Sequence, residues 1–109
     1  MPRATEKVTP FAARVYAALQ TIPAGSVITY AALGRRAGCG SPRAVGQALR
    51  ANPLAPAVPC HRVIAADLSP GGFFGESKGP EIARKLRLLS AEGVHFANNR
   101  LAEEHRLIR

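Results

Sequence analysis

Several features are scarce in this sequence, and each scarcity excludes a class of protein. Only two of its 109 residues are cysteines, too few for a disulfide framework, so we expect free thiols. No apolar stretch approaches the length of about 20 residues that a membrane-spanning helix requires. Residues 1–7 contain no apolar segment of the kind found in secretion signals. We therefore expect one intracellular domain with no membrane partner, in the cytoplasm or, if the source is eukaryotic, in the nucleus.

Acidic residues are scarce in one part of the chain. None occurs between Glu6 and Asp67, whereas seven Lys and Arg residues lie in that interval. The net charge of +8 is therefore concentrated there, and the remainder is nearly neutral. A field of one sign attracts polyanions and speeds their arrival. A solvated basic surface that keeps the protein soluble is the alternative, and charge alone does not separate DNA from RNA or an anionic membrane.

The apolar pattern predicts short helices with clear start and stop signals. Capping residues or prolines begin them, and glycines or prolines end them. They cover residues 10–22, 30–37, 42–51 and 80–92. Residues 58–66 are expected to be extended, residues 67–79 form a glycine-rich loop, and the last segment is either a hairpin or a tail. We expect a single domain over residues 1–109, mainly α with short strands, with a core over about 9–94 and a tail over 95–109.

The second and third helices have the layout of a helix-turn-helix. They are joined by a glycine-containing turn, and the third presents Arg43, Gln47 and Arg50 opposite its apolar face. Any helical hairpin with a charged face has the same pattern, so this layout alone does not establish nucleic-acid binding. Cys39 in the turn is interpreted as a structural or incidental thiol. In the last helix, Ile82, Leu86 and Leu89 are expected to face the core.

Cys60 and His61 are the candidates for chemistry. A thiol becomes nucleophilic when a cation or an imidazole promotes its ionisation, and Cys60 lies between Pro59 and His61-Arg62. Adjacent side chains of an extended segment point to opposite faces, so His61 would reach Cys60 only through a water or a local bend. Glu92 is the candidate acid for orienting the imidazole. The alternative is a buried thiol beside a surface histidine. Because the Cys and His spacings fit no zinc site, we expect no metal and no cofactor.

The segment Val58-Pro59-Cys60-His61-Arg62-Val63 resembles the active-site signature of the O6-alkylguanine-DNA alkyltransferases, also called methylated-DNA–protein-cysteine methyltransferases. Other motifs agree with that family in order and spacing over about residues 11–94. They are Ile22-Pro23-x-Gly25-x-Val27-x-Thr29-Tyr30, Arg43-Ala44-Val45-Gly46, Asn52-Pro53, Gly72-Phe73-Phe74-Gly75 and Lys85-Leu86-x-Leu88-Leu89-x-x-Glu92-Gly93.

The resemblance implies DNA repair. It implies a helix-turn-helix domain of the winged-helix-like alkyltransferase type, which binds double-stranded DNA through the minor groove and swings out an O6-alkylguanine. Cys60 would then take the alkyl group in one irreversible step, without a cofactor. His61 would ionise Cys60 through a water, Glu92 would orient His61, and Asn52 would brace the site.

The resemblance also implies which residues face the DNA and the damaged base. Tyr30 would rotate the nucleotide and protonate the leaving base, and Arg43 would fill the space left in the stack. Further expected DNA contacts are Ser41, Gln47, Arg50 and Arg62. The expected alkylguanine pocket includes Val63, Phe73, Phe74 and Gly75, with the Val63 carbonyl and the Phe74 amide reading the base. Phe74 is bulky for its position and is expected to reshape the pocket.

Two other functions fit parts of the sequence. Single-domain alkyltransferase-like proteins bind alkylated DNA without repairing it, and they typically carry tryptophan in place of the cysteine. A non-enzymatic lesion sensor of that kind is the alternative to a suicide methyltransferase, but the presence of Cys60 with His61, Asn52 and Glu92 favours transfer. A plain helix-turn-helix transcription factor leaves the Pro-Cys-His-Arg segment unexplained. We expect the protein to act as a monomer.

Overall fold

The computed structural model describes residues 9–38, 41–52, 58–73 and 78–108. Within these ranges, the helices are α2 (Pro10–Leu19), α3 (Tyr30–Arg36), α4 (Pro42–Arg50) and α5 (Pro80–Ala91), and the 3-10 turns are η1 (Cys60–Arg62) and η2 (Glu104–Arg106). The strands are β1 (Val27–Thr29), β2 (Val63–Ile64), β3 (Phe96–Ala97), β4 (Arg100–Leu101) and β5 (Leu107–Ile108). The expected class, mainly α with short strands, is confirmed. None of the described helices is both long and apolar enough to cross a bilayer.

Three helices begin where the sequence predicts, because a hydroxyl side chain caps each one. In each case the cap oxygen accepts a hydrogen bond from the backbone N–H three residues later, at 3.0–3.2 Å: Thr9 from Ala12, Thr29 from Ala32 and Ser41 from Ala44. A proline in the first turn accompanies two of these caps, in α2 and α4. These are local signals, so they act without help from the rest of the fold.

The first helix ends earlier than predicted. α2 stops at Leu19, and both the N–H and the hydroxyl of Thr21 bond to the carbonyl of Ala18, at 3.1 and 2.6 Å. Pro23 disfavours helical backbone at the residue before it, which adds to this early stop. Ile22 is still buried, because the turn that replaces the last helical residues returns its side chain to the core.

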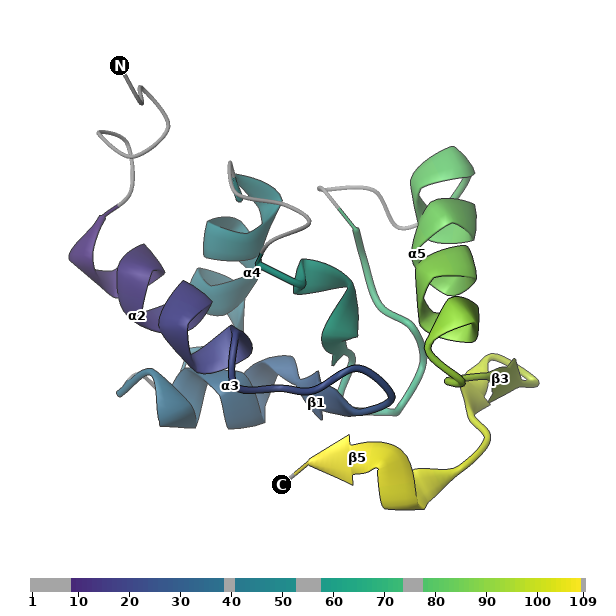
Figure 1. Cartoon of the computed structure of the whole chain (residues 1–109). Coiled ribbons are helices and arrows are strands. Elements are labelled where there is room, and N and C mark those ends of the chain that lie inside the picture. Colours follow the sequence, from purple (N-terminus) through teal and green to yellow (C-terminus); the bar gives the residue numbers. More distant parts are fainter. Residues whose placement is uncertain (1–8, 39–40, 53–57, 74–77, 109) are drawn as a thin grey trace.

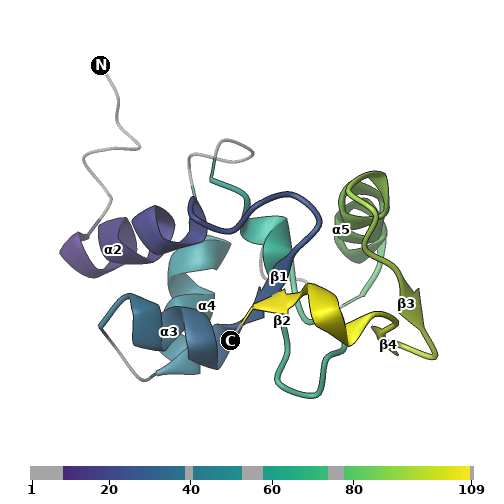
Figure 2. The ribbon, with the colours of Figure 1, turned by 60° about the horizontal axis from the view of Figure 1, so that its bottom comes forward.

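The sheet is built around β1, which pairs in parallel with β2 on one side and β5 on the other (Figure 2). The last segment is therefore part of the fold rather than a tail. It forms the antiparallel β3–β4 hairpin, turned at Asn98 and Asn99 with φ of +52° and +61°, and then returns as β5. Strands of two residues are too short for periodicity to detect, which explains the weak sequence pattern.

The main core joins α2 to the helix-turn-helix pair α3 and α4. Figure 1 shows these three helices on one side of the molecule and α5 on the other, with η1 between them. Two side chains of α2 hold the pair in place: the Tyr16 hydroxyl donates to the carbonyl of Ala48 in α4 at 2.7 Å, and Arg14 Nε donates to the carbonyl of Ala37 after α3 at 3.0 Å. The expected DNA-facing helix is thus rigidly mounted on the core.

The buried face of α5 differs from the one expected. Leu89 is fully buried and Ile82 partly buried, but Leu86 is 37% exposed, and the fully buried neighbour is Lys85. Both positions 85 and 86 fall near the face that Ile82 and Leu89 define, so spacing alone does not decide between them. Hydrophobicity alone would bury Leu86. Lys85 is buried instead, because backbone carbonyl groups surround position 85 in three dimensions and accept its hydrogen bonds.

Candidate functional site

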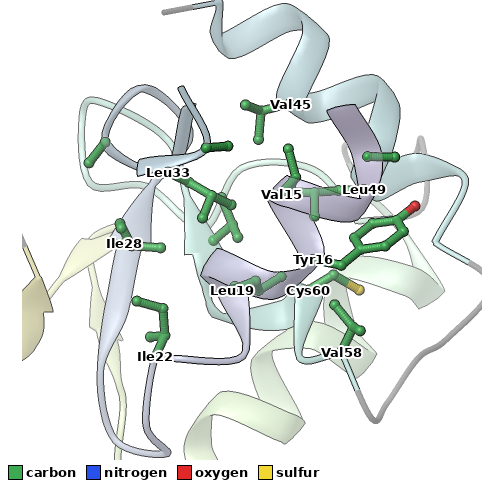
Figure 3. Packing of buried hydrophobic residues seen from close by; sticks show 14 of the residues in the cluster. Val15, Tyr16, Leu19, Ile22, Ile28, Leu33, Val45, Leu49, Val58 and Cys60 are labelled. Atoms are coloured by element: carbon green, nitrogen blue, oxygen red, sulfur yellow. The ribbon is translucent and has the colours of Figure 1, made fainter. Parts of the chain in front are cut away.

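Cys60 starts a tight turn rather than lying in an extended segment. The N–H of Arg62 donates to the carbonyl of Pro59 at 3.0 Å, and this turn forms η1 before the chain enters β2. The local bend that the sequence left open is therefore present. Cys60 is 6% exposed and belongs to the main buried cluster, where Figure 3 shows it among Tyr16, Val58 and Leu49. The sulfur has a sheltered position with one open side, toward the pocket described below.

The surroundings of Cys60 do not favour the thiolate. Burial raises the pKa of its thiol above the ordinary value, and the opposing effects of a hydrogen bond from Asn52 and the positive charges of Lys85 and Arg84 do not outweigh burial. The raised pKa runs against the expectation that Pro59 and His61-Arg62 give Cys60 a local environment that favours the thiolate. A base is needed to remove the proton.

His61 and Arg62 both bind Glu92, the residue at the end of α5. His61 Nε2 lies 2.9 Å from Glu92 Oε2, Arg62 Nη2 donates to the same oxygen at 2.8 Å, and Arg62 Nε donates to Oε1 at 2.9 Å. Burial acts to raise the pKa of Glu92, but the hydrogen bonds from Arg62 and His61 lower it below its ordinary value. An ionised carboxylate only accepts hydrogen bonds, so Nε2 carries the proton and Nδ1 of a neutral His61 is left as an acceptor.

Arg62, an expected DNA contact, binds groups of the protein itself. Besides its two bonds to Glu92, it donates from Nη1 to the carbonyl of Ile22 at 2.8 Å, and its side chain is only 16% exposed. Its three contacts tie η1 to the end of α5 and to the turn after α2. The guanidinium is thus hydrogen-bonded to groups of the protein itself.

Asn52 connects the end of α4 with the segment that carries Cys60. Its side chain is buried, donates from Nδ2 to the carbonyl of Val58 at 3.2 Å, and also hydrogen-bonds to Cys60. These two contacts link α4, the helix that presents Arg43, to the segment that carries Cys60. The bracing role of Asn52 stays a prediction.

A pocket of about 610 Å³ brings six of the expected residues together: Tyr30, Arg43, Gln47, Arg50, Cys60 and Phe73. Its lining also includes Gly71 and Gly72. Arg43, Gln47 and Arg50 are exposed at its rim, whereas Cys60 and Phe73 are buried. Side chains from α3, α4, η1 and the glycine-rich loop thus converge on one cavity.

Tyr30 spans this pocket from the start of α3 to the glycine-rich loop. Its hydroxyl donates to the carbonyl of Gly72 at 3.3 Å, and burial raises the pKa of Tyr30. Gly71 packs against the tyrosine ring so closely that a Cβ there would lie 3.3 Å from Cε2. The phenol therefore stays protonated at neutral pH and keeps a hydrogen available for donation.

The remaining expected residues lie in other positions. The Ser41 hydroxyl caps α4, which places it at the start of the helix expected to face DNA. Val63 is fully buried, and its carbonyl accepts a hydrogen bond from Lys85. Phe74, Gly75 and Cys39 lie outside the described residues. Lys85 itself is a site residue that the sequence reasoning missed, although its position on the apolar face of α5 was a detectable signal.

Comparison with known families identifies the chain. Residues 10–94 match the family described as 6-O-methylguanine DNA methyltransferase, DNA binding domain. The chain belongs to this family. The match begins at α2 and ends just after Glu92, so it includes the helix-turn-helix and the pocket residues, and it confirms the resemblance found in the sequence.

Individual relatives point in the same direction. The chain is 44% identical over 86 residues to a methylated-DNA–protein-cysteine methyltransferase of Methanothermobacter thermautotrophicus, covering 79% of this chain and 46% of that protein. It is 46% identical over 87 residues to a DNA base-flipping protein of Thermus thermophilus, covering 80% of this chain and 55% of that protein. The chain thus spans about half the length of these curated relatives.

A solved structure matches almost end to end. This is S. pombe Atl1 in complex with damaged DNA containing O6-carboxymethylguanine, with a TM-score of 0.78, 28% identity, and coverage of 91% of this chain and 94% of that one. The expected helix-turn-helix alkyltransferase-type fold is therefore confirmed.

Proposed function

We propose that this domain repairs DNA by binding a duplex that contains O6-alkylguanine, flipping the damaged base into its pocket and transferring the alkyl group to Cys60. One observation carries the proposal: a single cavity is lined by the nucleophile, by Tyr30, and by the exposed Arg43, Gln47 and Arg50 of α4. A cavity with a basic, exposed rim and a buried thiol suits a reaction on a base that moves from the duplex to the thiol.

Base flipping explains why these groups adjoin. The alkylated base inside a duplex is out of reach of a buried thiol, and unstacking it costs a few kcal/mol, least for a damaged pair. The basic residues of α4 offset this cost through phosphate contacts, and Arg43, at the pocket rim, fills the space in the stack. Asn52 keeps α4 and Cys60 in fixed positions relative to each other during this movement.

The chemical step then proceeds on the flipped base. The Cys60 proton passes through a bridging water to Nδ1 of His61, and ionised Glu92 stabilises the imidazolium that forms. The thiolate attacks the alkyl carbon, so a C–S bond forms as the bond from carbon to O6 breaks and its electron pair passes to guanine. Tyr30 donates a proton to the leaving base. Because the thioether product is stable, each molecule reacts once.

A direct experiment tests the proposal. The protein is incubated with a duplex carrying one O6-methylguanine, and the peptide containing Cys60 is weighed, with Cys60→Ala as the control. We expect that peptide to gain the mass of one methylene and the duplex to lose its methyl group. An unmethylated peptide, with the duplex bound and still methylated, would reject transfer.

That second outcome is the behaviour of a lesion sensor, which is the alternative function. It is favoured by the end-to-end match to Atl1, which was solved with damaged DNA, and by the identity with a base-flipping protein. Both functions require the same partner, double-stranded DNA with O6-alkylguanine, and hence a compartment that holds DNA: the cytoplasm, or the nucleus of a eukaryote. We propose that the domain acts as a monomer.

A further inference from the structure

Lys85 is a buried cation whose hydrogen-bond partners are backbone carbonyls. Its exposure is 0%, and Nζ donates to the carbonyls of Val63 at 2.7 Å, Pro70 at 2.5 Å and Gly72 at 2.9 Å. Within the described ranges, no carboxylate pairs with it. Burying an ammonium without a counter-charge is unfavourable, and a leucine-like side chain would avoid that cost. The presence of a lysine here therefore points to a role beyond packing.

The three carbonyls belong to two segments next to the pocket, and Gly72 itself lines it. Val63 begins β2, directly after the turn that holds Cys60, whereas Pro70 and Gly72 belong to the glycine-rich loop. An ammonium has three hydrogens, so each carbonyl receives one. Gly72 also accepts the hydroxyl of Tyr30, which brings a third element into the same network.

The glycine-rich loop depends on such contacts for its position. Gly71 has φ of +73°, and neighbouring glycines give the backbone wide conformational freedom. The aromatic ring of Phe73 lies beside the lysine, with its centroid 5.9 Å from Nζ. Lys85 thus holds the loop backbone through Pro70 and Gly72, and the strand that follows Cys60 through Val63.

We infer that Lys85 is a positioning residue that sets the shape of the pocket, and with it the selectivity for alkylated over unmodified guanine. It acts by holding the Val63 carbonyl and the loop at residues 70–72 at a fixed distance from each other. This inference rests on the proposed function, since it concerns the same pocket. It assigns the lysine to lesion discrimination rather than to general affinity for DNA, because Lys85 is fully buried.

The network is also sensitive to protonation. A neutral amine has two hydrogens and a lone pair, so deprotonation leaves one of the three carbonyls without a donor. Burial lowers the pKa of Lys85 to about 7, and the negative charge of ionised Cys60 acts to raise it. The other groups near it are Tyr30, reached through Gly72, and Arg84, whose guanidinium lies 5.8 Å from the Phe73 ring.

A binding experiment isolates this role. Cys60→Ala is used as the parent, so that no transfer occurs, and fluorescence anisotropy gives its affinity for a duplex with one O6-methylguanine and for the unmodified duplex. Adding Lys85→Met should reduce the ratio of the two affinities by about tenfold or more, because small misplacements in a preorganised site are costly. Affinity for unmodified DNA should stay the same. Lys78→Met, the same change at an exposed lysine, is the matched control and should alter neither.

The outcomes separate the inference from the function on which it rests. A parent protein that binds both duplexes equally contradicts the proposed function. A parent that discriminates, together with a folded Lys85→Met variant that discriminates equally well, overturns the inference alone. A purely structural lysine would lower the melting temperature but leave the affinity ratio of the folded protein unchanged.

A second measurement needs no substitution at Lys85. Because the sequence has only three lysines, the titration of Lys85 can be followed by NMR of ¹³C-labelled lysine in the Cys60→Ala parent. Between about pH 6 and about pH 9, where the raised pKa keeps Tyr30 protonated, selectivity should fall with the same midpoint as Lys85 deprotonation. Selectivity that stays constant through that midpoint would overturn the inference.

Discussion

Glu92→Gln tests how His61 prepares Cys60. The substitution keeps the shape of the side chain but replaces one carboxylate oxygen with an NH2 group. In the native site, Oε2 accepts from His61 and Arg62 while Oε1 accepts from Arg62. The amide oxygen of glutamine can occupy only one of these two positions. In either orientation, the NH2 group in the other position faces a hydrogen-bond donor. His61 keeps its acceptor only in the orientation that turns the NH2 group toward Arg62 Nε, and in both orientations it loses the negative charge that would stabilise its imidazolium.

The size of the effect follows from the contacts. A positioned general base contributes about 10²–10⁴-fold to rate, so reaction at neutral pH should fall by about 100-fold or more. Stability should also fall, because the side chains of Glu92 and Arg62 are 18% and 16% exposed and the arginine is left without its counter-charge. We expect a loss of about 2–4 kcal/mol in the free energy of unfolding.

The pH dependence distinguishes this role from general damage to the site. Above the ordinary pKa of the thiol, Cys60 ionises without a base, so the defect of Glu92→Gln in reaction rate should shrink steadily as the pH rises. Stability changes in the opposite pH range. The pKa of Glu92 is lowered in the folded state, so its contribution is present above the unfolded value of 4.5 and is lost as the pH falls through the folded value.

Two assays follow these effects. Single-turnover transfer from an O6-methylguanine duplex, together with alkylation of Cys60 by iodoacetamide, is measured between about pH 6 and about pH 10. The matched control is Glu81→Gln on the same helix, since Glu81 pairs only loosely with Arg84, at 3.4 Å, and both side chains are more than one-third exposed. A control with native rates and a variant whose defect is the same at every pH would refute the base mechanism. Unchanged rates in Glu92→Gln would refute it too.

Other residues give simpler tests. Gly71→Ala forces a Cβ onto a residue with φ of +73° and to within 3.3 Å of the Tyr30 ring, so thermal unfolding should show a loss of about 1–2 kcal/mol. Arg43→Ala should slow repair of duplex DNA far more than reaction with a free alkylated base, and equal losses on both substrates would show that its role in filling the stack is wrong. Arg106→Ala removes a 3.0 Å hydrogen bond to the carbonyl of Gly25, so it should lower stability by about 0.5–1.5 kcal/mol, and an unchanged melting temperature would show that this contact does not anchor the C-terminal segment.

Much of the helical structure could be predicted because its signals are local. A hydroxyl cap acts on an amide three residues away. Thr9, Thr29 and Ser41 therefore each predict the start of a helix without reference to the rest of the chain. The same reasoning misplaced the end of α2 by three residues, since Thr21 and Pro23 compete with the apolar spacing that continues to Ile22.

The site was only partly predictable. Family resemblance identified Cys60, Tyr30 and Arg43, and the structure places all three on one pocket. It did not reveal that Arg62 turns inward to Glu92 or that Lys85 replaces a hydrophobic side chain in the core. Both residues form contacts with groups that are distant in sequence, so local spacing, which placed position 85 near the apolar face of α5, did not show what either residue binds.

By itself, the sequence determined the helix starts, the acid-free basic region and the order of the chemical groups, because each depends on residue type and near-neighbour spacing. Only the tertiary structure decided which charged groups are exposed and which are buried. It shows Arg43 and Arg50 exposed at the pocket rim, whereas Arg62 and Lys85 are held inside. It also places the Cys60 thiol where burial raises its pKa. Burial and the geometry of distant partners set these properties, and both arise only when the chain has folded.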